Sequence, residues 1–203
     1  MSIFGRSSNH IVEGSGRPAA ETRDVDAFSS VELAGSNNVV IRAGDEQSVV
    51  VKADDNLLEH VTTTVESGCL VIDNIGNVTA KSPMSVEIGM PRIDALTLSG
   101  SGYILADALE VDSLRTSLPG SGTLAGSGTA ERLDVAVSGS GSVQFTRLVA
   151  ADVHADVSGS GTISVTATER LAAAVSGSGA ILYSGNPPDV ATSVSGSGVI
   201  TGA

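Results

Sequence analysis

The sequence predicts an all-β protein, a right-handed parallel β-helix of about 19-residue coils with an inserted antiparallel β segment near the N-terminus. Three observations predict this fold. A Ser-Gly-Ser-Gly motif recurs at an almost constant spacing, apolar residues keep fixed offsets from it, and the 203 residues include 24 Gly, no Trp, three Phe and two Tyr. A core lined by aliphatic side chains suits thin, regularly stacked β layers better than a bulky globular centre.

The Ser-Gly-Ser-Gly motif marks a corner that each coil turns in the same way. Its glycines allow positive φ and a sharp turn, and stacked serine hydroxyls are expected to donate to the next coil. Coils about 4.8 Å apart place like residue on like residue, and the general crossover preference makes the helix right-handed. The motif stands at Ser99, Ser138, Ser158, Ser176 and Ser195, with Pro119–Gly122 as a further copy, in steps of 18 to 20 residues.

Apolar residues flank every corner at the same offsets. With the first serine as position zero, positions −1 and +5 are aliphatic in every copy, whereas −2 and −4 are small or polar, which predicts one strand with a buried face on each side of the corner. Each buried aliphatic side chain contributes roughly 1.5–3 kcal/mol. An antiparallel sandwich is the alternative, but it gives no reason for identical corners. The predicted ladders are Leu98, Leu118, Val137, Val157, Val175 and Val194 at −1, and Ile104, Leu124, Val143, Ile163, Ile181 and Ile200 at +5.

The chain divides into a lead-in and one repetitive domain. Residues 1–23 are polar and Gly-rich, and we expect a flexible N-terminal lead-in. Residues 24–203 form the single β-helical domain. Within it, 42–92 break the period and predict an antiparallel β excursion that covers one end of the stack, while 93–203 form the regular coils.

Composition excludes several classes of function. A net charge of −12 argues against nucleic acid and anionic membrane surfaces as partners. No apolar run is long enough for a membrane span, and 1–23 contain no signal-peptide pattern, so we expect a cytoplasmic protein or one whose export signal has been removed. The corner lacks the Lys of a phosphate loop and the Asp of calcium-binding β-rolls, and the single Cys69 looks like an ordinary strand residue. We expect no cofactor and no metal.

Alternating charges occupy the polar offsets before the corner. In stacked coils unlike charges become neighbours, and our hypothesis is that this exposed charge ladder fixes the stacking register. Its members are Ser113, Arg132, Asp152, Arg170 and Asp189 at −6, Arg115, Asp134 and His154 at −4, and Asp156 at −2.

The same residues support a catalytic alternative. Asp152, His154 and Asp156 share one strand face with Asp134 beside them, as expected for a carbohydrate-active enzyme, a polysaccharide lyase or hydrolase, that works on the outer face of a β-helix. Few basic groups are available to hold an anionic substrate, and no large aromatic residue lines this face. We therefore expect no enzyme activity and assign no catalytic residue.

Four segments follow one another along the chain in a specific order. They are Glu21–Val25 with Phe28, Asp54–Leu58, Gly68–Ile72, and the repeated Val-Ser-Gly-Ser-Gly followed by Ile181–Pro187. In this order they resemble the bacterial head GIN family, a domain of unknown function described as a putative auto-transporter adhesin. The resemblance covers residues 20–203. It implies a β-helical fold and an adhesive role outside the cytoplasm or at the cell surface, and it brings no functional residues with it.

Together these observations predict a noncatalytic adhesion or scaffold module. We expect its partner to be a glycan or a protein on a surface. The last coil has no capping segment after its corner, which predicts self-association through an open C-terminal edge.

Overall fold

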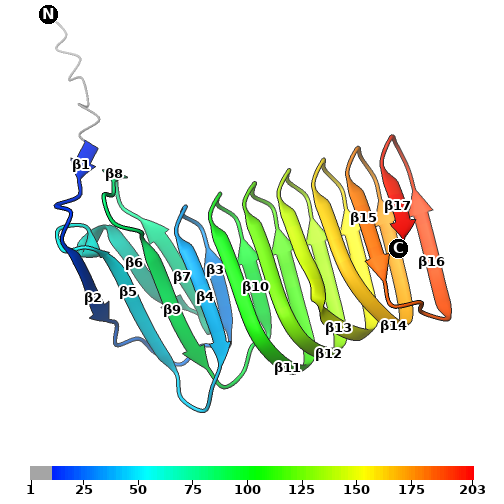
Figure 1. The fold of residues 1–203 in the computed structure, drawn as a ribbon, viewed down its shortest axis with the longest axis horizontal. Coiled ribbons are helices and arrows are strands. Elements are labelled where there is room, and N and C mark those ends of the chain that lie inside the picture. The colour runs from blue at the N-terminus through cyan, green and yellow to red at the C-terminus, as the bar shows by residue number, and fades with distance from the viewer. Residues whose placement is uncertain (1–10) are drawn as a thin grey trace, which may run out of the picture.

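The computed structural model describes residues 11–203 and is a parallel β-helix of stacked coils (Figure 1). Each coil runs up one sheet, turns the Ser-Gly corner, and returns along a second sheet. We call these the pre-corner sheet and the post-corner sheet. Every pairing between successive coils from β10 onward is parallel. The strands of this region are β10 (Ala95–Leu98), β11 (Tyr103–Leu118), β12 (Thr123–Val137), β13 (Ser142–Val157), β14 (Thr162–Val175), β15 (Ala180–Ser184), β16 (Asp189–Val194) and β17 (Val199–Gly202).

The predicted aliphatic ladders form the core between the two sheets. At position −1 the residues from Leu98 to Val175 are at most 1% exposed, and at +5 the residues from Ile104 to Ile181 are fully buried. Val194 and Ile200, on the last coil, remain accessible because no further strand of the described chain covers them. The sequence prediction of the buried face is therefore confirmed, and the stack supplies the hydrophobic core that one coil could not form alone.

The corner glycines are required by close contact between coils. A Cβ atom on Gly139 would lie closer than 3.0 Å to the carbonyl oxygens of Pro119 and Gly120 in the preceding coil. Among the glycines of the motif only Gly196 has positive φ. The prediction that these corners need glycine for its positive φ is therefore wrong at most of them. Glycine is still needed, because a side chain would collide with the backbone of the preceding coil.

Backbone groups, and not serine hydroxyls, join successive corners. Ser160 N donates to Gly139 O at 3.2 Å, and Thr162 N donates to Gly141 O at 3.0 Å, with equivalent bonds in neighbouring coils. In residues 11–203 no hydrogen bond connects the hydroxyls of successive corners, and Ser99 Oγ donates instead to Glu32 at 2.7 Å. No ladder of corner hydroxyls forms in the described chain, because the backbones approach closely enough to bond directly, and the predicted donation of a hydroxyl to an adjacent coil holds at Ser99 alone among the described corner serines.

Two further strands begin the stack. β3 (Ser30–Leu33) pairs with β10 and β4 (Asn38–Ala43) pairs with β11, both in parallel register, so residues 30–43 form the degenerate first coil. Strands β11 to β14 continue around the side opposite the corner, where their registers shift, for example between Ala106 and Leu109. These shifts absorb the differences in coil length.

The segment 42–92 contains parallel as well as antiparallel pairs. β5 pairs with β9 and β6 with β7 in antiparallel register, as predicted. However, β7 pairs with β3 and β9 with β4 in parallel register, so this segment adds one more layer to the stack. This layer could not be predicted from the sequence, because the segment contains no corner motif from which to count. The strands are β5 (Ser48–Asp54), β6 (Val61–Glu66), β7 (Cys69–Asn74), β8 (Asn77–Thr79) and β9 (Ser85–Met90), and η1 is a 3-10 turn (Leu58–His60).

The expected flexible lead-in holds two strands within its described part. β1 (Ile11–Glu13) pairs with β8 in parallel, and β2 (Pro18–Thr22) pairs with β5 in antiparallel register. The expectation for 1–23 is therefore corrected for residues 11–22, whose backbone groups bond to strands of the inserted segment. Residues 1–10 lie outside the described residues.

Candidate functional site

The structure stacks the predicted charge ladder on the outer face of the pre-corner sheet. Ser113, Arg132, Asp152, Arg170 and Asp189 are consecutive cross-strand partners on β11, β12, β13, β14 and β16. Parallel strands in register place such side chains about 4.8 Å apart. The register comes from the corner, because all five lie six residues before the motif.

Ion pairing within this row centres on Arg170. Its Nε lies 3.1 Å from Asp189 Oδ2, and its Nη1 lies 3.3 Å from Asp152 Oδ2. The hydrogen bond to Asp189, with the nearby charge of Asp152, raises the pKa of the Arg170 guanidinium. One arginine therefore bridges three successive coils from the outside. Its side chain is 60% exposed, so solvent weakens each pair.

The −4 row is less closely connected. Arg115, Asp134 and His154 are cross-strand neighbours, but no ion pair joins them in the described part of the chain. Instead His154 Nε2 lies 2.9 Å from Asp156 Oδ2, two residues further along the same strand. The predicted residues are thus all on one face, in two separate groups: Arg170 with its two aspartates, and His154 with Asp156.

This arrangement offers little for catalysis. His154 and Asp156 are 55% and 46% exposed in their side chains, so water competes at the pair, and Asp152 is occupied by Arg170. Within residues 11–203 no group of three or more His, Cys, Asp or Glu is placed to hold a metal ion. His154 borders an open hollow that is lined by small residues of the next two strands, including Ala172 and Thr192, so a substrate there would stay in contact with solvent.

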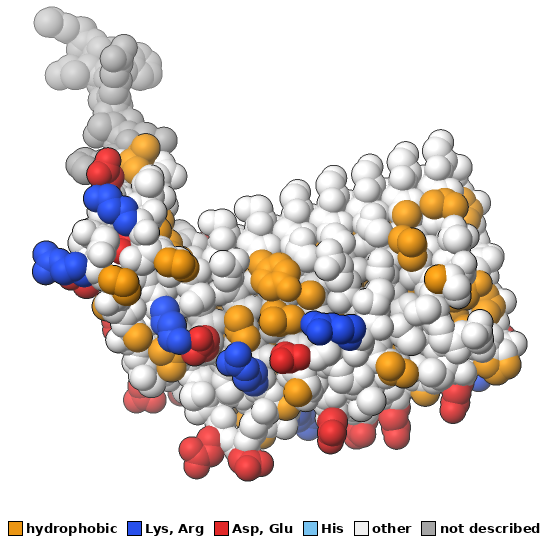
Figure 2. All heavy atoms as spheres, viewed as in Figure 1, with side chains coloured by type: hydrophobic (Ala, Val, Ile, Leu, Met, Phe, Trp, Pro, Cys, Tyr) orange, Lys and Arg blue, Asp and Glu red, His pale blue; other side chains and the backbone are white. Residues whose placement is uncertain are grey.

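A second row of charges, on the post-corner sheet, was missed by the sequence analysis. Arg42 on β4 is the cross-strand partner of Asp107 on β11, and Ser127 on β12 is the partner of Arg147 on β13. Figure 2 shows basic and acidic side chains alternating along this face, below a group of hydrophobic ones. The sequence does contain a signal for this row. At eight residues after the start of a corner, three coils carry polar residues, namely Arg42, Asp107 and Ser127.

Hydrogen bonds fix Asp107 in this second row. Ser127 Oγ donates to its carboxylate, and Ala108 N donates to Ser127 Oγ at 3.2 Å. The Ser127 hydroxyl, with the backbone N–H of Ala108 and the charges of Arg147 and Arg42, lowers the pKa of the Asp107 carboxyl. Ala108 has a φ of 56°, so this contact holds a strained backbone at the bend.

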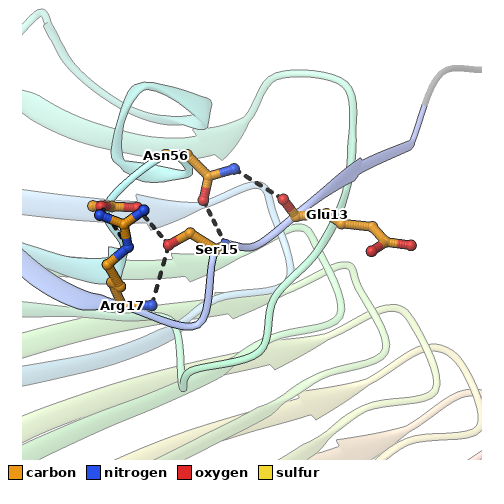
Figure 3. Close-up of polar contacts among 5 residues, drawn as sticks. Glu13, Ser15, Arg17 and Asn56 are labelled. Carbon is orange, nitrogen blue, oxygen red and sulfur yellow. Dashed lines mark hydrogen bonds and ion pairs between the residues drawn. The ribbon is translucent and has the colours of Figure 1, made fainter.

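A third polar cluster, which we call the N-terminal clasp, joins residues 13–17 to the turn 54–56 (Figure 3). Ser15 N donates to Asn56 Oδ1 at 2.8 Å, and Asn56 Nδ2 donates to Glu13 O at 2.9 Å. Ser15 Oγ donates to Asp55 at 2.5 Å, and Asp55 N donates to Arg17 O at 2.9 Å. These bonds satisfy backbone groups of both segments and join the start of the described chain to the inserted segment.

Beneath the clasp lies the buried Asp54. Its Oδ2 accepts hydrogen bonds from Lys81 N at 2.8 Å and Ser82 N at 3.3 Å. The side chain of Ser82, followed by the backbone N–H of Lys81, lowers the pKa of the Asp54 carboxyl. A Cβ on Gly14 would collide with this carboxylate, so glycine is required where the lead-in crosses it. Asp54 therefore bonds the loop at Lys81 and Ser82 directly beneath the segment that contains Gly14.

The stacked parallel coils define the protein as a β-solenoid, and its charged rows lie on the solvent-exposed outer faces of the two sheets. The family model described as "putative auto-transporter adhesin, head GIN domain" matches residues 27–187, and the chain belongs to this family. The sequence-based assignment to the family is thus confirmed. A search of curated proteins found no match.

Solved structures share the fold over almost the whole chain. A putative adhesin from Bacteroides fragilis aligns with a TM-score of 0.78 at 21% identity, over 95% of this chain and 100% of that one. A putative lipid binding protein from Parabacteroides distasonis gives 0.63 at 23%, over 96% and 100%. A putative adhesin from Parabacteroides merdae gives 0.53 at 19%, over 95% and 99%. At these identities the likeness concerns the fold.

Replacing Arg170 tests whether the first charge ladder holds the stacking register. Arg170→Asp removes two ion pairs and places three carboxylates in successive coils, so we expect the Tm to fall by about 2–4 °C, equivalent to roughly 1 kcal/mol in a chain of this size. Thermal unfolding followed by circular dichroism measures this. Arg92→Asp, the same charge change at an exposed loop arginine whose ion pair with Asp94 lies within the loop and not between coils, is the control. Equal Tm values for the two variants contradict the hypothesis.

Acid should weaken the N-terminal clasp through Asp54. Because its pKa in the folded state lies below the unfolded value of about 3.9, ionised Asp54 stabilises the fold above that pH, and this contribution is lost as pH falls through the folded-state pKa. Asp54→Asn should therefore lower the Tm at pH 7 and approach wild type below about pH 4. Asp45→Asn, an exposed turn substitution, is the control. A Tm difference independent of pH contradicts this role.

Proposed function

We propose that this protein is a noncatalytic adhesion or scaffold module that presents the outer faces of its β-helix to a surface glycan or protein. The observation that carries the proposal is the pair of outer faces, each with a row of charged side chains held in register by the backbone ladder. Membership of an adhesin-like family supports it and suggests a location outside the cytoplasm or at the cell surface. Within the described residues, no helix is both long and apolar enough to cross a membrane.

A carbohydrate-active enzyme is the second candidate, because His154 and Asp156 form a histidine–carboxylate pair. A glycosidase needs two carboxyl groups on either side of the scissile bond, within a site that binds the sugar. Here the pair lies on an exposed face and Asp152 is held by Arg170. The geometry therefore favours binding over cleavage.

Binding and turnover can be separated with one sample. The full chain is applied to an array of neutral and acidic glycans and to immobilised extracellular matrix proteins, and the glycans that bind are then incubated with it and analysed for cleavage products. The proposal predicts saturable binding without products. Products that disappear in His154→Ala support the enzyme instead, and absence of binding to every glycan and protein contradicts the adhesion role.

The last coil supports a further part of this proposal, self-association through its open edge. Val190, Val194 and Val199 are 42%, 48% and 53% exposed, and β16 and β17 each pair with one strand in the described chain. Residues 190–203 carry no charged side chain, so the edge lacks the charges that usually prevent strand pairing. A second copy can continue both sheets there.

Sedimentation velocity over a range of concentrations tests this association. We expect a concentration-dependent shift from monomer to dimer or larger species, abolished by Val194→Lys because a buried lysine at a new strand interface is costly. Val149→Lys, at an exposed valine on the bend of a central coil, is the matched control and should associate normally. A monomer at all concentrations contradicts the proposal.

A further inference from the structure

The post-corner sheet carries a compact patch that combines apolar and charged side chains. We call it the Tyr103 patch. Tyr103, Leu105 and Asp107 point to the same side of β11, because alternate residues of a strand share a face. Their cross-strand partners on β4 and β12 extend the patch to both sides. These partners are Asn38, Val40 and Arg42 on β4, and Thr123 and Ala125 on β12. Beside Asp107 the patch also includes Ser127 on β12, which bonds to Asp107, and its cross-strand partner Arg147 on β13.

The apolar part of the patch lies beside the charged part. Tyr103, Leu105 and Val40 are each half-buried, so part of every side chain stays accessible. In Figure 2 the hydrophobic group over β4 and β11 lies directly above the row of basic and acidic side chains. The described chain has only two tyrosines and no tryptophan, and Tyr103 alone lies on the outer face of a central coil. A ligand there meets an aromatic ring and charged groups together.

The charged part has a fixed carboxylate and two arginines. Asp107 is held by Ser127 and Ala108, as described above. Arg42 and Arg147 are exposed, and neither forms an ion pair with any residue in 11–203. Two positive charges and one negative charge leave this patch positive on a chain whose net charge is −12. The patch is therefore complementary to an anionic group.

We propose that the Tyr103 patch binds a saccharide that carries a single carboxylated sugar. Tyr103 and Leu105 would contact the apolar face of the sugar ring, as aromatic side chains provide large contact area with a defined orientation. Arg147 would bind the sugar carboxylate, since guanidinium and carboxylate groups match in a two-pronged hydrogen bond. Asp107 would accept hydrogen bonds from sugar hydroxyls.

Charge distinguishes Arg147 from Arg42 in this site. Arg42 is the direct cross-strand neighbour of Asp107, whereas the neutral Ser127 separates Asp107 from Arg147. A ligand carboxylate bound to Arg147 would thus lie farther from the negative charge of Asp107 than one bound to Arg42. The net charge of the chain opposes a long polyanion, so the ligand fits as an isolated acidic sugar and not as a densely charged polymer. This assignment rests on the proposed adhesive function.

The experiment compares an acidic disaccharide with its neutral counterpart. Cellobiouronic acid, in which glucuronic acid is linked to glucose, and cellobiose are titrated into the full chain, with binding followed by NMR. We expect cellobiouronic acid to bind more tightly. Arg147→Gln should weaken it by about tenfold while leaving cellobiose unchanged, the effect of losing one charged hydrogen-bond partner. Tyr103→Ala should weaken both sugars.

Arg132→Gln is the matched control, because Arg132 is an exposed arginine without an ion pair in the described chain, on the opposite sheet. Equal losses for Arg132→Gln and Arg147→Gln, or unchanged binding in Tyr103→Ala, overturn the assignment of the patch while leaving glycan binding in place. No binding of cellobiouronic acid up to its solubility limit also overturns it. The proposed adhesive function is decided separately by the array, which does not depend on this patch.

Discussion

The whole stack depends on the close approach of successive backbones at the glycine corner. A Cβ atom at Gly139, Gly159 or Gly177 would lie closer than 3.0 Å to a carbonyl oxygen of the preceding coil. Backbone N–H groups donate across this contact in each coil. These hydrogen bonds fix which residue of one corner lies next to which residue of the following corner. Because every strand is counted from its corner, they also fix which side chains become neighbours.

This register determines both the interior and the surface. Inside, equal offsets bring aliphatic residues together, and an occasional large residue is matched by a small one: a Cβ on Gly126 would lie 2.9 Å from the ring of Phe145. Outside, the same register places Arg170 between Asp152 and Asp189 on one sheet and Arg42 beside Asp107 on the other. The function proposed above accordingly uses these displayed rows of side chains.

The sequence predicted what repeats and missed what does not. The inward positions and the −6 row followed from counting around the motif, since period and alternation are local properties of the chain. The pairing of β7 with β3 could not be predicted, because it joins segments without a motif. The clasp at Ser15 and Asn56 was missed for a similar reason: polar, Gly-rich sequence looks flexible until its bonding partners are known. The Tyr103 patch could have been found by aligning the positions after the corner as carefully as those before it.

The thermal stability of Gly139→Ala tests the central claim most directly. Ser140→Ala, one residue away with an exposed side chain, is the matched control. The account predicts that the added methyl group forces adjacent corners apart and costs more than about 1 kcal/mol, lowering the Tm by at least about 2–4 °C, while Ser140→Ala remains close to wild type. A Gly139→Ala protein as stable as Ser140→Ala would contradict the claim that close backbone contact at the corner holds the stack together.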